Sequence, residues 1–83
     1  EVEGEQSGIT MKVYTDLPGV QFYTGNFLEG VRGKRNMIYH DNSGFCLETQ
    51  YYPNAANEES FPSPVLKKGE KYDTTTIYQF GVR

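Results

Sequence analysis

The chain has 83 residues, with 8 Lys and Arg against 11 Asp and Glu, so its formal net charge is −3. This balance disfavours a nucleic-acid partner, which requires a concentrated basic surface. No apolar run approaches the roughly 18 residues of a membrane span, so the sequence predicts no membrane partner.

Composition also limits how the chain can be stabilised. Only 36% of its residues are hydrophobic, and a domain of this size buries only about 60% of its unfolded surface. Its one cysteine, Cys46, excludes an internal disulfide, and the single histidine makes a structural metal site unexpected. These properties favour a fragment, or a chain that docks onto a larger body.

The absence of an initiator Met fits a fragment or a processed start. A free cysteine without a secretory signal points to the cytoplasm.

The N-terminal half reads as strands separated by turns. Residues 1–7 are polar and are expected to form an exposed lead-in. Alternation of Ile9, Met11 and Val13 with polar residues predicts a strand over residues 8–15. Residues 16–19, Asp-Leu-Pro-Gly, are typical of a turn, and a second strand is expected over residues 20–24.

The C-terminal half continues this pattern. A glycine-containing loop over residues 27–35 precedes a possible short strand at 37–39, and a strand follows at 45–50. Residues 52–64 form a long irregular connection, a kind of loop that is often functional. The last strand is expected over residues 71–81. No segment has a helical period, so we predict an all-β chain whose strands complete sheets of a larger structure.

Glu48 stands out because it lies within an otherwise weakly polar strand. Period two places it on the same face as Cys46 and Gln50, opposite Phe45, Leu47 and Thr49. It is either an ordinary exposed strand glutamate or a general base tuned by partial burial. Periodicity alone does not distinguish the two.

Three other residues carry similar alternatives. Gln21, between Val20 and Phe22, is suited either to a cross-strand hydrogen bond or to binding a sugar hydroxyl. His40 lies among turn residues and is expected to be exposed rather than catalytic. Cys46 has no basic neighbour in sequence, so an inert buried thiol is the default interpretation.

Several blocks resemble the C-terminal part of the aldose 1-epimerase (galactose mutarotase) family. The two longest are Pro-Gly-Val-Gln-Phe-Tyr-Thr-Gly-Asn-Phe-Leu at residues 18–28 and Ser-Gly-Phe-Cys-Leu-Glu-Thr-Gln at residues 43–50. Shorter matches follow in the same order at residues 52–57, 61–62, 66–72 and 74–76. The resemblance covers residues 9–82, nearly the whole chain, and long ordered blocks are far more specific than one short motif.

The resemblance implies an enzyme that interconverts the α and β anomers of free aldoses such as galactose and glucose. The family has a large antiparallel β-sandwich, and residues 1–83 would form the C-terminal portion of that single domain. No cofactor is needed. Glu48 takes the place of the general base, and Gln21 matches a position that contacts the sugar. The family's acid histidine lies upstream of the matched region, and His40 does not replace it.

Three hypotheses follow. The chain is the base-bearing part of a mutarotase whose acid comes from an N-terminal remainder, in the same or a separate chain. Alternatively, it is a non-catalytic carbohydrate-binding β-module, or an inactive structural fragment. The isolated segment is expected to be almost inactive, because one general acid or base typically contributes about 10²–10⁴-fold.

Overall fold

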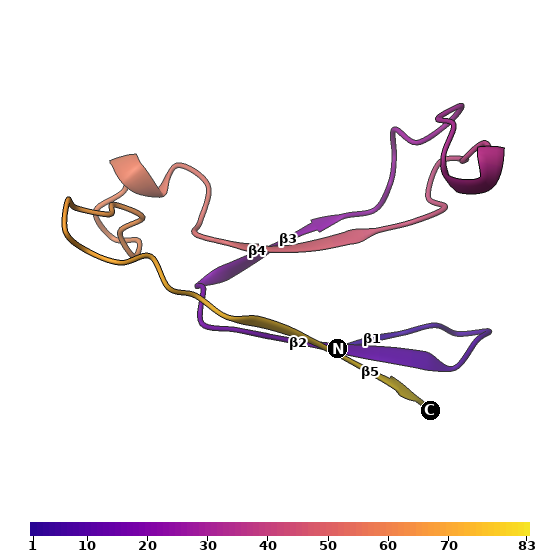
Figure 1. Ribbon diagram of the computed structural model, residues 1–83, viewed down its shortest axis with the longest axis horizontal. Helices are drawn as coiled ribbons and strands as arrows, with labels where there is room; N and C mark the ends of the chain where they lie inside the picture. Colours follow the sequence, from indigo (N-terminus) through magenta and orange to yellow (C-terminus); the bar gives the residue numbers. More distant parts are fainter.

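Five antiparallel strands and two short 3₁₀ turns make up the structure, a computed structural model that describes all of residues 1–83 (Figure 1). The chain is therefore all-β, as the sequence predicts. The elements are β1 (Val2–Glu3), β2 (Ile9–Thr15), β3 (Gly19–Tyr23), η1 (Lys34–Asn36), β4 (Cys46–Gln50), η2 (Ala55–Asn57) and β5 (Thr76–Val82). None of its helices has the length and apolar character needed to cross a membrane.

One sheet has three strands in the order β1–β2–β5. Strands β2 and β5 pair along seven residues, from Ile9 opposite Val82 to Thr15 opposite Thr76. Because side chains alternate along a strand, this register places the apolar residues of both strands on one face. That face contains Ile9, Met11, Val13, Tyr78, Phe80 and Val82.

The second sheet is the β3–β4 ladder, in which Gly19 lies opposite Gln50 and Tyr23 lies opposite Cys46. Residues 16–18 of the predicted turn carry the chain from β2 in the first sheet to β3 in the second, and the fourth predicted turn residue, Gly19, is already the first residue of β3. The Asp16 carboxylate accepts a hydrogen bond from the Thr75 N–H at 3.1 Å. This contact ties the turn to the segment that enters β5.

The two sheets lie one above the other and are joined by side chains from β5 (Figure 1). The Thr76 hydroxyl lies 2.8 Å from that of Thr49 in β4 and 3.2 Å from that of Thr15 in β2. The Tyr78 hydroxyl donates to the Leu47 carbonyl at 2.9 Å. These contacts turn the apolar faces of the two sheets toward each other.

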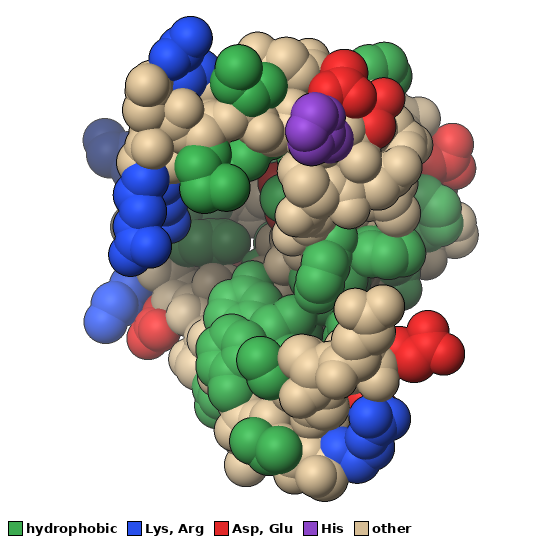
Figure 2. Space-filling view, turned by 90° about the vertical axis from the view of Figure 1, so that its right-hand side faces the viewer, with side chains coloured by type: hydrophobic (Ala, Val, Ile, Leu, Met, Phe, Trp, Pro, Cys, Tyr) green, Lys and Arg blue, Asp and Glu red, His purple; other side chains and the backbone are tan.

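The space between the sheets is left largely open. Ala55 is the only hydrophobic residue that is buried, whereas Phe22 and Phe80 are 59% and 69% exposed. A hollow of about 510 Å³ between the sheets is lined mainly by hydrophobic side chains. Figure 2 shows hydrophobic side chains exposed between the upper and lower layers. The chain thus has two apolar faces that its own residues do not cover.

Two predicted strands differ from the structure. Residues 37–39 do not form a strand, because the tight turn around η1 leaves room for only one isolated bridge, between Arg32 and Ile38. The last strand begins at Thr76 rather than at residue 71. Its partner β2 ends at Thr15 and then turns away, so residues 71–75 have no strand with which to pair.

The lead-in at residues 1–7 contains a short element that the sequence did not indicate. Val2 pairs with Met11 and Glu3 pairs with Thr10, which forms β1. The Glu3 carboxylate also pairs with the Arg83 guanidinium, so the two ends of the chain meet at this sheet. Residues 5–7 are exposed, as expected for most of this segment.

Candidate functional site

Glu48 and Gln21 lie directly opposite each other in the β3–β4 ladder. Residues that face each other across an antiparallel pair have Cβ atoms about 5 Å apart and project from the same side. The neighbouring pairs, Val20 with Thr49 and Phe22 with Leu47, project from the other side toward the three-stranded sheet. The ladder therefore has an inner apolar face and an outer polar face, and both candidate residues lie on the outer one.

Both side chains are exposed, and neither is engaged in an ion pair or a side-chain hydrogen bond within the chain. The cross-strand hydrogen bond considered for Gln21 does not form. A carboxylate and an amide side by side offer oxygen acceptors and an N–H donor, which is the combination that binds sugar hydroxyls. A general base tuned by its surroundings requires partial burial. For Glu48 that burial would have to come from groups outside this 83-residue chain.

Cys46 also lies on the outer polar face, opposite Tyr23 and two residues from Glu48. Its thiol is exposed, so the interpretation as a buried thiol is wrong. The reason is that the outer face of this ladder has no covering layer within the chain. Cys46 therefore borders the same open surface as Glu48.

Loops rise at both ends of the ladder, on the side away from the three-stranded sheet (Figure 1). The loop between β3 and β4 is closed by Asn42, whose side-chain amide donates to the Thr24 carbonyl at 2.9 Å and to Asn26 Oδ1 at 2.8 Å. Gly25 is buried there with φ +78°, and a Cβ would lie 2.5 Å from the Gly44 carbonyl oxygen. Only glycine fits this position, so the Gly25 of the sequence block has a structural reason.

His40 belongs to this loop and does not join Glu48. Its imidazole Nδ1 lies 2.7 Å from Glu29 Oε2, and its side chain is 77% exposed. His40 is exposed, as the sequence indicates, and its contact is local to the loop. No group of three or more His, Cys, Asp or Glu side chains gathers closely enough to hold a metal ion.

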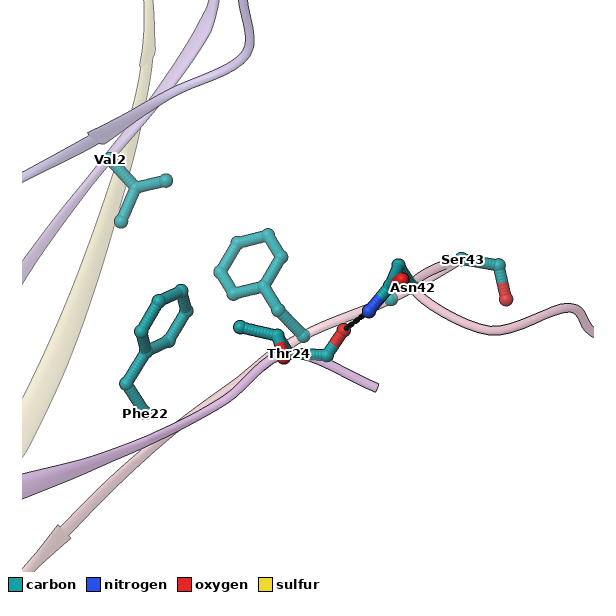
Figure 3. A pocket seen from close by; sticks show the side chains of 7 residues that line it. Val2, Phe22, Thr24, Asn42 and Ser43 are labelled. Atoms are coloured by element: carbon teal, nitrogen blue, oxygen red, sulfur yellow. Dashed lines mark hydrogen bonds between the residues drawn. The ribbon is translucent and has the colours of Figure 1, made fainter. Parts of the chain in front are cut away.

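The hollows beside the ladder lie on its inner side, away from the polar pair. One of about 220 Å³ is lined by Val2, Phe22, Phe45 and residues of the β3–β4 loop, and it contains no titratable side chain (Figure 3). Phe22 and Phe45 pack edge to face, with ring centroids 6.3 Å apart. The three hydrophobic side chains of this hollow lie on the inner side of the ladder, and neither Glu48 nor Gln21 lines it.

Sequence reasoning did not single out Tyr52, whose ring reaches the outer face at its Gly19 end. The only signal was indirect: Tyr52 lies two residues after Gln50, the partner of Gly19. A glycine at that position leaves a gap that a nearby ring can fill.

A family model described as aldose 1-epimerase matches residues 1–79. The chain belongs to the aldose 1-epimerase family. It is 54% identical to the human galactose mutarotase and 56% identical to the bovine one, over 77 residues that make up 92% of this chain. It is 40% identical to the aldose 1-epimerase of Escherichia coli strain K12 over 74 residues, or 87% of this chain.

The matched part is a small portion of these aldose 1-epimerase relatives. The chain spans 22% of the length of the two mammalian proteins and 21% of the bacterial one.

Proposed function

We propose that residues 1–83 form the C-terminal, base-bearing portion of an aldose 1-epimerase domain acting on free aldoses such as galactose and glucose. The observation that carries this proposal is the pairing of Glu48 with Gln21 on an open polar face. Family membership adds that the surrounding sequence belongs to enzymes of this kind. The exposed Cys46 thiol fits a reducing compartment such as the cytoplasm.

In this proposal Glu48 acts on the anomeric hydroxyl. Its carboxylate takes the proton from the hydroxyl on C1 while an acid outside these residues protonates the ring oxygen. The C1–O5 bond breaks, and an open-chain aldehyde forms. Rotation about the C1–C2 bond presents the other face of the carbonyl. Ring closure returns the ring-oxygen proton to the acid, and Glu48 gives its proton back to O1, so no proton or electron is lost.

Gln21 has a positioning role in this mechanism. Its amide donates to or accepts from a sugar hydroxyl beside the reacting carbon, because it projects from the same face as Glu48. Both side chains are carried by paired strands rather than by a loop. Two paired strands hold these side chains rigidly, and this restricts the approach of the substrate to a narrow range of geometries.

The open apolar faces support the view that more polypeptide completes the structure. Phe22 on the upper sheet and Phe80 on the lower are more than half exposed, and both face the space between the sheets. Covering such surface stabilises a protein by about 25 cal/mol per Å² of apolar area. We propose that the N-terminal remainder of the domain, in the same or a separate chain, covers these faces. It would complete a β-sandwich and supply the acid.

The test is a chimeric enzyme in which the matching 77-residue segment of human galactose mutarotase is replaced by that of this chain. Polarimetry of α-D-galactose then follows the interconversion of anomers. We expect activity in the chimera, and a fall in kcat of about 10²–10⁴-fold in Glu48→Gln, because glutamine cannot accept the proton. Glu5→Gln is the control, since Glu5 is exposed and lies in the β1–β2 turn of the other sheet.

Two outcomes would overturn the proposal. Full activity in Glu48→Gln would mean that the base lies elsewhere. An inactive chimera that folds and still binds galactose would favour the alternative function, a carbohydrate-binding module that keeps the polar face but performs no chemistry.

A further inference from the structure

The ring of Tyr52 occupies a place on the outer polar face. A Cβ built on Gly19 would lie 3.0 Å from both Cδ1 and Cε1 of that ring. Because side chains alternate along β3, this missing Cβ would project from the same face as Gln21. Residues two apart on a strand are about 7 Å apart. The Tyr52 ring therefore borders the surface formed by Gln21 and Glu48.

The ring is held in place but not covered. Phe61 packs against Tyr52 edge to face, with ring centroids 5.1 Å apart and an interplanar angle of 67°. The Tyr52 carbonyl accepts a hydrogen bond from the Ala55 N–H at 3.1 Å, and Ala55 is the buried residue of η2. Even so, Tyr52 and Phe61 remain 39% and 37% exposed. The pair thus presents apolar surface beside two hydrogen-bonding groups.

We propose that Tyr52, backed by Phe61, forms the apolar wall of the sugar site and packs against the C–H face of the pyranose ring. This inference rests on the proposed function of Glu48 and Gln21. A pyranose is amphipathic. Its hydroxyls require hydrogen-bonding groups, whereas its axial C–H groups form an apolar face whose transfer out of water has a favourable free energy. Aromatic rings supply that surface, and sites for small molecules combine such rings with a few polar groups.

This geometry gives Tyr52 a binding role rather than a chemical one. The ring lies at the Gly19 end of the ladder, where the Gly19–Gln50 pair is two positions along from the Gln21–Glu48 pair. It would orient the sugar so that its anomeric hydroxyl meets Glu48. The ring, and not the hydroxyl, carries the effect. The preferred ligands are aldohexopyranoses in which several C–H groups share one face.

The experiment measures KM and kcat for galactose in the chimeric enzyme. We expect Tyr52→Ala to raise KM about tenfold with kcat changed much less. The reason is that the ring would bind the sugar equally well in the ground state and in the transition state. Tyr52→Phe keeps the ring and should keep KM within about twofold of the parent value. Tyr72→Ala is the matched control, because Tyr72 is a 59% exposed tyrosine that also lies between β4 and β5.

A second variant guards against misfolding. Gly19→Ala leaves Tyr52 intact but places a methyl group against its ring, so it should also raise KM. Circular dichroism checks that each variant is folded. Unchanged KM in folded Tyr52→Ala, or a loss in Tyr52→Phe equal to that in Tyr52→Ala, would overturn the inference. Neither result depends on Glu48→Gln, which tests the proposed function separately.

Discussion

Glu48 and Gln21 are placed by the simplest rule of strand geometry. Each lies between residues that project inward, so each must project outward, and the ladder register brings the two together. Gly19 and Gly25 act at the two ends of the same ladder. Gly19 leaves a gap that Tyr52 fills, and Gly25 allows the close approach that ends β3. At the residue scale the candidate site thus depends on the side chains of Glu48 and Gln21 and on two glycines, Gly19 and Gly25, that have no side chain.

Gly25 provides a residue-scale prediction. In the chimeric enzyme, Gly25→Ala should lower the free energy of unfolding more than Gly30→Ala. Both glycines have positive φ, at a cost of about 1–2 kcal/mol for alanine. Only Gly25 adds a clash, with the Gly44 carbonyl oxygen at 2.5 Å, whereas nothing lies within 4 Å at Gly30. Urea denaturation checks the difference, and equal losses would show that the loop adjusts freely.

At the scale of elements, β5 joins the two sheets. It pairs with β2 along its length, and its side chains reach up to β4 through Thr76 and Tyr78. Strand β5 therefore sets the position of the β3–β4 ladder that carries Glu48. The alternation along β5 was readable in sequence, but its contact with β4 was not.

Thr76 provides the element-scale prediction. Its hydroxyl lies within hydrogen-bonding distance of Thr15 and Thr49, and all three groups are partly buried. Thr76→Val keeps the shape but removes these contacts, so we expect the chimeric enzyme to lose about 1–2 kcal/mol of stability. Thr74→Val is the control, because Thr74 is also half-buried but lies outside the strand. Thermal unfolding checks the prediction, which an unchanged melting temperature for Thr76→Val would contradict.

At the scale of the whole molecule, the chain has two sheets but no covered core. A hollow of about 510 Å³ separates the apolar faces, and Ala55 is the only hydrophobic residue removed from solvent. The outer edge of β5 is also unpaired, and its sequence Thr-Ile-Tyr-Gln-Phe-Gly-Val contains no charge and no proline. Such an edge is a template for pairing with another strand.

We therefore expect the isolated chain to assemble or to remain poorly folded. Sedimentation velocity should show species larger than a monomer, and calorimetry should show no sharp unfolding transition. Gln79→Lys places a charge on β5 and should reduce assembly, as charged residues do on natural edge strands. A monomer that melts sharply would contradict this prediction.

The sequence by itself determined the all-β class, the cores of four of the five strands, and the faces on which Glu48 and Gln21 project. It could do so because alternation is a local property of a strand. Its blocks also pointed to the aldose 1-epimerase family, to which the chain belongs. The roles of Glu48 and Gln21 in catalysis and binding stay predictions.

The tertiary structure decided the features that a local sequence pattern does not specify. Register placed Glu48 opposite Gln21, and the end of β2 at Thr15 moved the start of β5 from residue 71 to Thr76. The same pairing left Cys46 exposed and brought the Tyr52 ring against Gly19. Each of these depends on which strand lies beside which, and that is set by contacts between residues distant in sequence rather than by the alternation within any one strand.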